Sequence, residues 1–183
     1  MLKVMQVNDF AITGDGTDIA WEKCEYHTLS ITNNGNSTYK TLMKISWSES
    51  GVYFLFYCQD NIITCTKKDE LDDNCKEDFI SILFQFDKDS DIFFKYYITP
   101  IEMELPLLIQ ANNHSFFKWK PLDYIAERKV RKKTKGIDGK CKPLEIVNGW
   151  HAEFQIPFKL ISGFHNVPPA KGTTWRSYAP VKN

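Results

Sequence analysis

The sequence predicts an antiparallel β-sandwich, a single domain over residues 1–183 with two packed sheets of the immunoglobulin or jelly-roll kind. Two observations support this prediction. Apolar residues alternate with period two along several short runs, and polar turn sequences separate these runs, while helical periodicity is scarce. The turn sequences are TGDGTD, NNGNS, DKDSD, NNH, GIDGK and PPAKG. Many short strands joined by such turns are typical of all-β sandwiches.

Four runs define the expected strands. Residues 51–58, GVYFLFYC, are apolar on both faces and predict a strand that is buried on both sides. Residues 79–86 and 92–99 each place large apolar side chains on one face and a mixed set, which includes Ser81, on the other. Residues 150–158, WHAEFQIPF, alternate most regularly, until Pro157 ends the ladder.

The charge balance excludes a general attraction to nucleic acid or to an anionic membrane. The chain has 23 basic and 23 acidic residues, so its formal net charge is zero. Acids gather between residues 69 and 78, and bases gather between residues 128 and 142. We expect the basic run to be a solvated loop rather than a polyanion-binding patch, because it has neither helical periodicity nor interleaved aromatic residues.

Cysteine usage and apolar segments give further limits. The five cysteines are an odd number and contain no CxxC pair, so we expect neither a zinc site nor a complete disulfide framework. The chain opens without the uninterrupted apolar stretch of a secretory signal. No segment is long and apolar enough to cross a bilayer.

The sequence predicts no catalytic residues. Glu102 and Glu104 lie two positions apart and would share one face of a strand, but solvated glutamates are a simpler interpretation than the facing carboxyl pair of a glycosidase. There is no GxSxG elbow for a serine nucleophile. The four histidines are dispersed and lack the HxxxH spacing of a metal site. We therefore do not expect an enzyme.

Calcium is a candidate metal ion for the acidic loops. Asp15, Asp18 and the acids between residues 69 and 78 are in predicted loops, and calcium prefers hard oxygen ligands of this kind. Acids in turns are more often solvated than metal-bound, so no cofactor is the first expectation and calcium is the alternative.

The aromatic content allows sugar binding, because a pyranose ring offers apolar faces and a hydroxyl rim. Trp21 and Trp150 are expected to be structural, and Trp47 is undecided. Trp119, in the polar sequence SFFKWKPLDY, is the best candidate for an exposed stacking platform. Its alternative role is to anchor a loop.

An ordered series of motifs resembles the family 9-like carbohydrate-binding modules of bacteria that digest polysaccharides. The motifs are FAITGDGTDIAWEKCEYHTL, SESGVYFLFYCQD, KEDFISILFQF, FFKYYITPIEMELPLLI, WKP, GWHAEFQIPFKLI and VPPAKGTTWR. The resemblance implies a β-sandwich that binds sugars, often at glycan chain ends, without hydrolysing them. It also implies export from the cell in most members and bound calcium in some.

The sequence departs from this family pattern at the ligand residues that the resemblance implies. The family tryptophan that stacks on the sugar falls on Cys75, and the first acid pair falls on Glu77 and Asp78. The strand glutamate that accepts from sugar hydroxyls falls on Ser81. A thiol offers no flat face, and a serine carries no charge to strengthen a hydrogen bond.

On the next strand, the resemblance places Lys95 and Tyr97 at positions that are acidic in relatives. Tyr97 could still stack and Lys95 could still donate a hydrogen bond, which allows a different ligand. The predicted ligand residues are Trp119, Lys95, Tyr97, Ser81, Asp78 and Arg176. Our hypothesis is a non-catalytic carbohydrate-binding domain associated with polysaccharide degradation, with an oligo- or polysaccharide as partner. The alternatives are a degenerate module that acts as an interaction or dimerising domain, and an accessory domain of a glycoside hydrolase.

The end of the chain also departs from the family pattern. Relatives continue past GxxWR with a second stacking tryptophan and a final strand, whereas this chain reads WRSYAPVKN. A missing strand would expose unpaired backbone groups at a sheet edge. A partner chain could cover such an edge by strand addition or swapping, so a homodimer through this C-terminal edge is one alternative.

Overall fold

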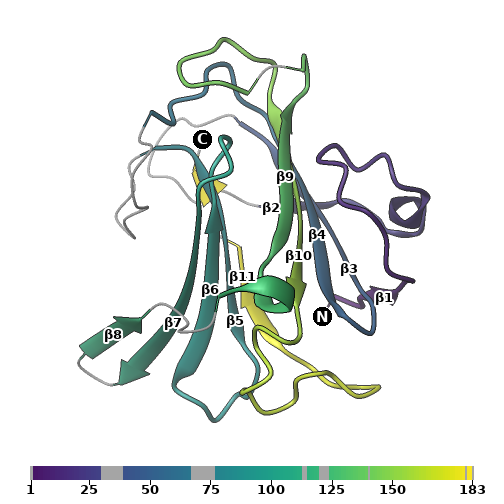
Figure 1. Ribbon diagram of the computed structural model, residues 1–183, viewed down its shortest axis with the longest axis vertical. Helices are drawn as coiled ribbons and strands as arrows, with labels where there is room; N and C mark the ends of the chain where they lie inside the picture. The colour runs from purple at the N-terminus through teal and green to yellow at the C-terminus, as the bar shows by residue number, and fades with distance from the viewer. Residues whose placement is uncertain are drawn as a thin grey trace.

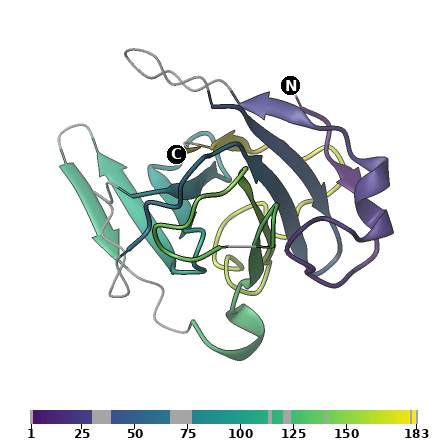
Figure 2. The same ribbon diagram turned by 90° about the horizontal axis from the view of Figure 1, so that it is seen from above.

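A computed structural model describes residues 2–29, 39–66, 77–112, 115–119, 124–139, 141–179 and 181–182. Two six-stranded sheets pack face to face, and Figures 1 and 2 show them as two layers. The predicted β-sandwich is confirmed. The helices of the described residues are two short 3-10 turns, η1 (Ile19–Lys23) and η2 (Ala126–Arg128). The described part of the chain contains no helix with the length and apolarity to cross a bilayer.

The first sheet, sheet 1, has the strand order β1-β3-β4-β10-β9, and β2 pairs with β3 beside β1. Its pairs are antiparallel except for the short parallel pair of β1 with β3. The strands are β1 (Met5–Gln6), β2 (His27–Leu29), β3 (Thr41–Trp47), β4 (Gly51–Cys58), β9 (Arg131–Gly136) and β10 (Trp150–Pro157).

The second sheet, sheet 2, has the strand order β11-β5-β6-β7-β8, and β12 also pairs with β5. All of its pairs are antiparallel. The strands are β5 (Phe79–Gln85), β6 (Ile92–Ile98), β7 (Glu104–Asn112), β8 (Ser115–Trp119), β11 (Arg176–Tyr178) and β12 (Val181–Lys182).

The core between the sheets is rich in phenylalanine. Phe54 and Phe56 of β4 stack on Phe154 of β10, with ring centroids 5.2 and 5.9 Å apart. The inward-facing side chains of β5 and β6 meet them from sheet 2. Trp150 is fully buried in this core, as expected from its phase along β10. The alternation that predicted β4, β5, β6 and β10 therefore defines which face of each strand is buried in the sandwich.

The outer face of sheet 1 is covered by the N-terminal segment, which Figure 1 shows in purple beside β3 and β4. Phe10 stacks on Tyr53 at 4.2 Å and contacts Trp21 edge-on at 5.3 Å. Trp21, Cys24, Tyr53 and Leu55 form a second buried cluster on this side. This cover explains why β4 is apolar on both faces, and it confirms the structural role predicted for Trp21.

A fully buried carboxylate attaches the N-terminal segment to sheet 1. Oε2 of Glu153 accepts hydrogen bonds from the backbone N–H groups of Thr13 and Gly14, at 2.8 and 2.6 Å. Its other oxygen accepts from Nε1 of Trp21 at 2.8 Å. Gly16 has φ of 69°, and a Cβ atom there would lie 2.3 Å from Leu55, so the loop requires glycine.

The basic run predicted to be a solvated loop is instead the strand β9 at the edge of sheet 1. Exposed Arg131, Lys133 and Lys135 alternate with half-buried Lys132 and Thr134. The prediction was wrong because lysines occupy both the outward and the inward positions of this strand. The sequence therefore shows no alternation of apolar and polar residues, although burial does alternate. Lysines on an edge strand also discourage pairing with another chain.

Replacing Glu153 by glutamine tests the N-terminal attachment. The amide cannot accept at both positions, so buried donors lose their partner, and we expect a destabilisation of about 1–3 kcal/mol. Urea unfolding measures the change. Glu22→Gln, at an exposed position of η1, is the matched control and should leave the midpoint unchanged. Equal midpoints for Glu153→Gln and the unmutated protein would contradict this account.

Candidate functional site

Three of the predicted ligand residues lie together on the outer face of sheet 2. Ser81 of β5 pairs with Tyr97 of β6, and Leu83 pairs with Lys95. Paired residues of antiparallel strands point to the same face, and the alternate residues of both strands are in the core. The register therefore places Ser81, Lys95 and Tyr97 side by side, facing away from the sandwich interior.

Lys95 and Tyr97 form a cation–π pair on this face. The Lys95 ammonium is 4.4 Å from the centroid of the Tyr97 ring. Lys95 is half-buried, and burial lowers its pKa from the ordinary value. The Tyr97 ring is 2% exposed and contacts Phe79 edge-on at 5.3 Å. Tyr97 thus supports the ammonium from below and offers little ring surface to a ligand in this structure.

The outer face is closed over β7 and open towards β11. Leu105, Leu107 and Ile109 of β7 are buried in one cluster with Tyr97. On the β11 side, Tyr178 is 58% exposed and Leu83 is half-buried. The accessible part of the face is therefore its β11 side, and Lys95 lies at the boundary.

Tyr178 is a candidate ligand residue that sequence analysis did not identify. It pairs with Leu83, which pairs in turn with Lys95, so the three occupy one row across β11, β5 and β6. Arg176 pairs with Gln85 one row away and is exposed. Arg176 and Tyr178 are two residues apart in WRSY, so they point to the same side of a strand. Only the long-range pairing of β11 with β5 shows that this side is the outer face of sheet 2.

The Ser81 hydroxyl is buried, and the described residues offer it no hydrogen-bond partner. Leaving a buried hydroxyl unpaired costs about 1–3 kcal/mol. A water molecule or a polar group is needed to satisfy it. Ser81 is thus a polar point within an apolar part of the face.

Asp78 lies at the start of β5 and is buried. Its carboxylate accepts from the backbone N–H of Thr64 at 2.6 Å and from the Thr64 hydroxyl at 2.7 Å. Burial and the neighbouring Asp78 carboxylate raise the pKa of Asp60. Oδ2 of Asp60 is buried, and the described residues give it no hydrogen-bond partner. Asp60 and Asp78 are therefore a pair of buried acids.

The other predicted calcium ligands have structural partners. Asp15 forms an ion pair with Lys135 at 2.5 Å, and Asp18 caps η1 by accepting from the Ala20 N–H at 2.9 Å. Across the residues that the structure describes, no group of three His, Cys, Asp or Glu side chains is placed to hold a metal. The acids between residues 69 and 73, and Cys75, lie outside the described residues.

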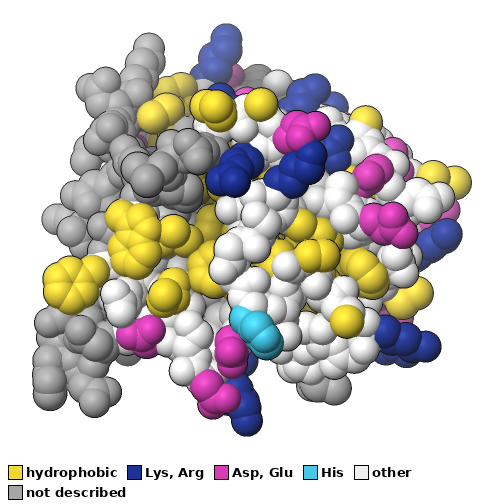
Figure 3. Space-filling model, turned by 60° about the horizontal axis from the view of Figure 1, so that its bottom comes forward, with side chains coloured by type: hydrophobic (Ala, Val, Ile, Leu, Met, Phe, Trp, Pro, Cys, Tyr) yellow, Lys and Arg dark blue, Asp and Glu magenta, His cyan; other side chains and the backbone are white. Residues whose placement is uncertain are grey.

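Trp119 lies on β8 and is exposed, as predicted. Its strand position, however, belongs to the opposite face of sheet 2 from that of Lys95. It pairs with Leu108, whose side chain packs towards the core, whereas Lys118 pairs with Ile109 of the outer face. The Trp119 side chain is 39% exposed. Figure 3 shows hydrophobic side chains in a band across the lower end of the molecule, and Figure 1 places β8 at the left of this end. The register does not bring Trp119 to the face of Lys95.

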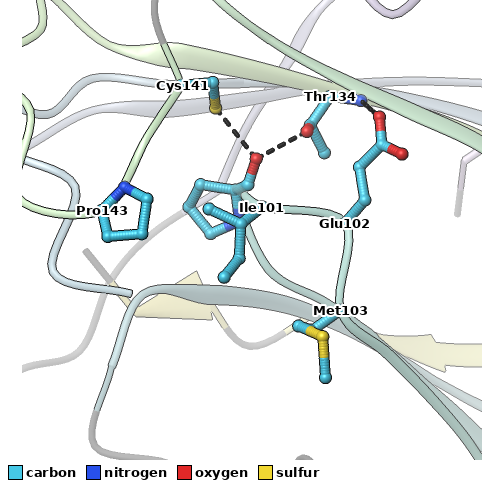
Figure 4. Close-up of a pocket in the computed structure, with 7 residues that line it drawn as sticks. Ile101, Glu102, Met103, Thr134, Cys141 and Pro143 are labelled. Atoms are coloured by element: carbon cyan, nitrogen blue, oxygen red, sulfur yellow. Dashed lines mark hydrogen bonds between the residues drawn. The ribbon is translucent and has the colours of Figure 1, made fainter. Parts of the chain in front are cut away.

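A pocket of about 450 Å³ lies between the β6–β7 turn and β9 (Figure 4). Its polar groups are occupied by structural hydrogen bonds. The Thr134 hydroxyl and the Cys141 thiol donate to the Pro100 carbonyl at 2.6 and 2.9 Å, and Glu102 accepts from the Thr134 N–H at 3.0 Å. Burial raises the pKa of Cys141 to about 11, so this thiol stays protonated near neutral pH.

Glu104 links the two sheets rather than forming a carboxyl pair with Glu102. It accepts from the hydroxyls of Tyr96 and Tyr124 at 2.7 and 2.8 Å, and it forms an ion pair with Lys132 at 2.6 Å. Glu102 lies in the turn before β7 with φ of 64°, so strand alternation does not relate the two acids as expected.

Comparisons with known proteins give a fold but no sequence family. No protein-family model matches the sequence, and no curated protein is significantly similar to it. The chain is similar in structure to a family 9 carbohydrate-binding module from Caldicellulosiruptor kristjanssonii in complex with glucose. The TM-score is 0.63 at 15% identity, over 99% of this chain and 78% of that chain. The module from the same organism in complex with cellotriose gives 0.61 at 15% identity, over 98% and 76%.

A protein of proposed carbohydrate-binding function from Bacteroides uniformis gives a TM-score of 0.74 at 13% identity, over 98% of this chain and 82% of that chain. The predicted resemblance to family 9 modules is therefore confirmed at the level of the fold. The chain has the β-sandwich of this class of carbohydrate-binding module.

Lys132→Met tests the link between the sheets. It leaves the largely buried Glu104 carboxylate without its cation, and we expect a destabilisation of about 1–3 kcal/mol in urea unfolding. Lys133→Met alters the next, exposed lysine of the same strand and serves as the control. If both variants unfold at the same urea concentration, the ion pair does not join the sheets.

Proposed function

We propose that this protein is a non-catalytic carbohydrate-binding domain whose ligand lies on the β11 side of the outer face of sheet 2. The observation that supports this proposal is the exposed Tyr178 ring in one row with Lys95, beside Arg176. A flat ring stacks on the apolar face of a pyranose, and long polar side chains reach its hydroxyl rim. Ser81 and Tyr97 lie on the same face, next to this row.

The fold supports a saccharide as the class of ligand. The two similar modules from Caldicellulosiruptor kristjanssonii were solved with glucose and with cellotriose. A shared fold does not by itself transfer a function, so the proposal depends on the residues of this chain. The association with polysaccharide degradation is part of the same proposal.

The absence of catalysis is also part of the proposal. Glycoside hydrolysis needs two carboxyl groups across the scissile bond. Glu102 and Glu104 bind Thr134, Tyr96, Tyr124 and Lys132 instead, which supports a structural role for both acids. Release of nitrophenol from a panel of aryl glycosides would restore the alternative of a hydrolase domain.

Tyr178→Ala tests the ligand site. Loss of the stacking ring should weaken saccharide binding about tenfold or more, equivalent to about 1.4 kcal/mol. Isothermal titration calorimetry against an oligosaccharide panel measures the affinity, and circular dichroism checks the fold. Tyr26→Ala removes an exposed tyrosine on the opposite side of the molecule and should bind normally. If the unmutated protein binds no saccharide of the panel, the proposal is wrong.

Trp119→Ala separates the two faces of sheet 2. We expect it to weaken binding less than Tyr178→Ala, because Trp119 lies in the opposite phase of the sheet. The reverse order of effects in the same titration would move the ligand to the β8 surface and favour the role first predicted for Trp119.

We further propose that Asp60 and Asp78 hold a calcium ion. The buried Oδ2 of Asp60, without a hydrogen-bond partner among the described residues, supports this proposal. Two carboxylates supply part of the oxygen shell that calcium takes, and calcium would relieve the repulsion between them. A shared proton between the two acids is the simpler alternative.

A thermal-shift assay distinguishes calcium from a shared proton. Calcium added to chelator-treated protein should raise Tm, and Asp60→Asn should abolish the rise. Asp89→Asn, in the exposed turn after β5, should retain it. An unchanged Tm of the unmutated protein at millimolar calcium would contradict the proposal.

The homodimer stays a prediction. In the described residues β11 and β12 pair with β5, so the edge available to a second copy is that of β11, which has three residues. Light scattering over a range of protein concentrations measures the mass directly. A monomer at every concentration would remove this alternative.

A further inference from the structure

We infer that the core side of the β7–β8 hairpin is a second saccharide-binding surface, on which Phe117 and Trp119 stack on two units of one linear chain. We call it the hairpin surface, and it consists of Phe117, Trp119, Leu108 and Gln110, with the adjacent Asp91. The saccharide as the class of ligand rests on the proposed function. The inference adds a separate surface, on the other face of sheet 2 from Tyr178, and a preference for longer chains.

The register of β7 and β8 gives the hairpin surface two rows. Trp119 pairs with Leu108, and Phe117 pairs with Gln110. Paired residues of antiparallel strands point to the same face, and Leu108 packs against the core cluster. The hairpin surface is therefore the outward continuation of the core side of sheet 2.

Sheet 1 lies over the first part of β7. Its edge strand β9 meets Glu104 of β7 through Lys132, and it also contacts the turn before β7. Strand β8 pairs with the second part, residues 108–112, and Figures 1 and 2 both show β8 away from β9. The side chains of Phe117 and Trp119 are accordingly 56% and 39% exposed. Two exposed aromatic rings on one face indicate a binding surface more strongly than a single surface residue does.

The two rings are spaced along one strand. Phe117 and Trp119 are two residues apart on β8, so their Cα atoms are about 7 Å apart. Their side chains project to the same face, so a linear saccharide that runs along β8 brings one sugar unit over each ring. Stacking uses the apolar face of each pyranose. A long chain therefore engages both rings, whereas a short saccharide engages one.

Polar groups lie beside the Phe117 ring. Gln110, its cross-strand partner, is half-buried, and its amide donates a hydrogen bond to Oδ2 of Asp91 at 3.1 Å. Asp91 is exposed, and a carboxylate accepts several hydrogen bonds. This amide–carboxylate pair is placed to accept from the hydroxyl rim of a sugar stacked on Phe117. Aromatic faces with a few polar groups beside them are suited to a saccharide.

The same polar pair favours a saccharide over a second copy of this chain. Strand β8 is an edge of sheet 2, so two copies that paired through it would bring both hairpin surfaces to the interface. The carboxylate of Asp91 and the amide of Gln110 would then lose hydration. Charged residues are depleted at the centres of protein interfaces for this reason. A sugar chain instead offers hydroxyl groups to the carboxylate.

A Tyr178→Ala background isolates the hairpin surface. Cello-, xylo- and galacto-oligosaccharides, each of two and six units, are titrated by calorimetry into the full chain. We expect the Tyr178→Ala protein to bind a hexasaccharide about tenfold more tightly than the disaccharide, because the longer chain stacks on both rings. Phe117→Ala or Trp119→Ala, each added to Tyr178→Ala, should remove this advantage.

Two further variants in the same background identify the kind of contact. Trp119→Leu keeps an apolar side chain without a flat ring and should behave like Trp119→Ala, because stacking needs the ring. Tyr26→Ala removes an exposed ring on the opposite side of the molecule, and it should retain the hexasaccharide advantage. Circular dichroism checks that each variant is folded.

The outcomes separate the inference from the proposed function. A hexasaccharide advantage that survives both Phe117→Ala and Trp119→Ala would overturn the inference and leave the proposed function intact. A Tyr178→Ala protein that binds no saccharide would do the same. If the unmutated protein binds no saccharide, both are wrong. Self-association in light scattering that Trp119→Ala abolishes would assign the rings to a second copy and overturn the inference.

Discussion

The structure depends on covering both faces of the central strands of sheet 1. Nearly all side chains of β4 and β10 are buried, on both faces of these strands. One face packs on sheet 2, and the other face requires a separate cover. The N-terminal segment supplies this cover, and the buried Glu153 carboxylate holds it through neutral donors from the loop and from Trp21. A buried charge is tolerated here because several hydrogen bonds satisfy it. Over the residues that the structure describes, the outer faces of β4 and β10 are therefore covered, and the candidate ligand surface is on sheet 2.

Sheet 2 is itself asymmetric. Its β7 side is closed by a small apolar cluster, whereas its β11 side presents Tyr178, Arg176 and the edge of Lys95. The fold is similar to that of family 9 modules, and the proposal of a saccharide ligand depends on the side chains of this chain. The proposed site depends on the exposed Tyr178 ring, which lies beside Arg176 and in one row with Lys95.

Sequence alternation predicted the buried strands well and the edge strands poorly. The run 51–58 matches the bounds of β4, and the run 150–158 is one residue longer than β10, because hydrophobic period two is strongest where a strand is packed. Strand β9 lies in the basic run for which the sequence predicts a solvated loop, because its residues are mostly lysines and show no apolar alternation. Trp119 was correctly expected to be exposed, but its face depends on the register of the β7–β8 hairpin, which local sequence does not fix. Tyr178 was missed because β11 joins β5 from far along the chain.

Amide chemical shifts of isotope-labelled protein, recorded by NMR while acidic and neutral oligosaccharides are added in turn, test the central claim most directly. The account predicts that a bound saccharide perturbs amides of residues 83–85, 93–97 and 176–178 most strongly, because these surround the row of Tyr178 and Lys95. Largest perturbations on β8, or around the pocket between the β6–β7 turn and β9, would contradict it, as would a spectrum that no saccharide changes.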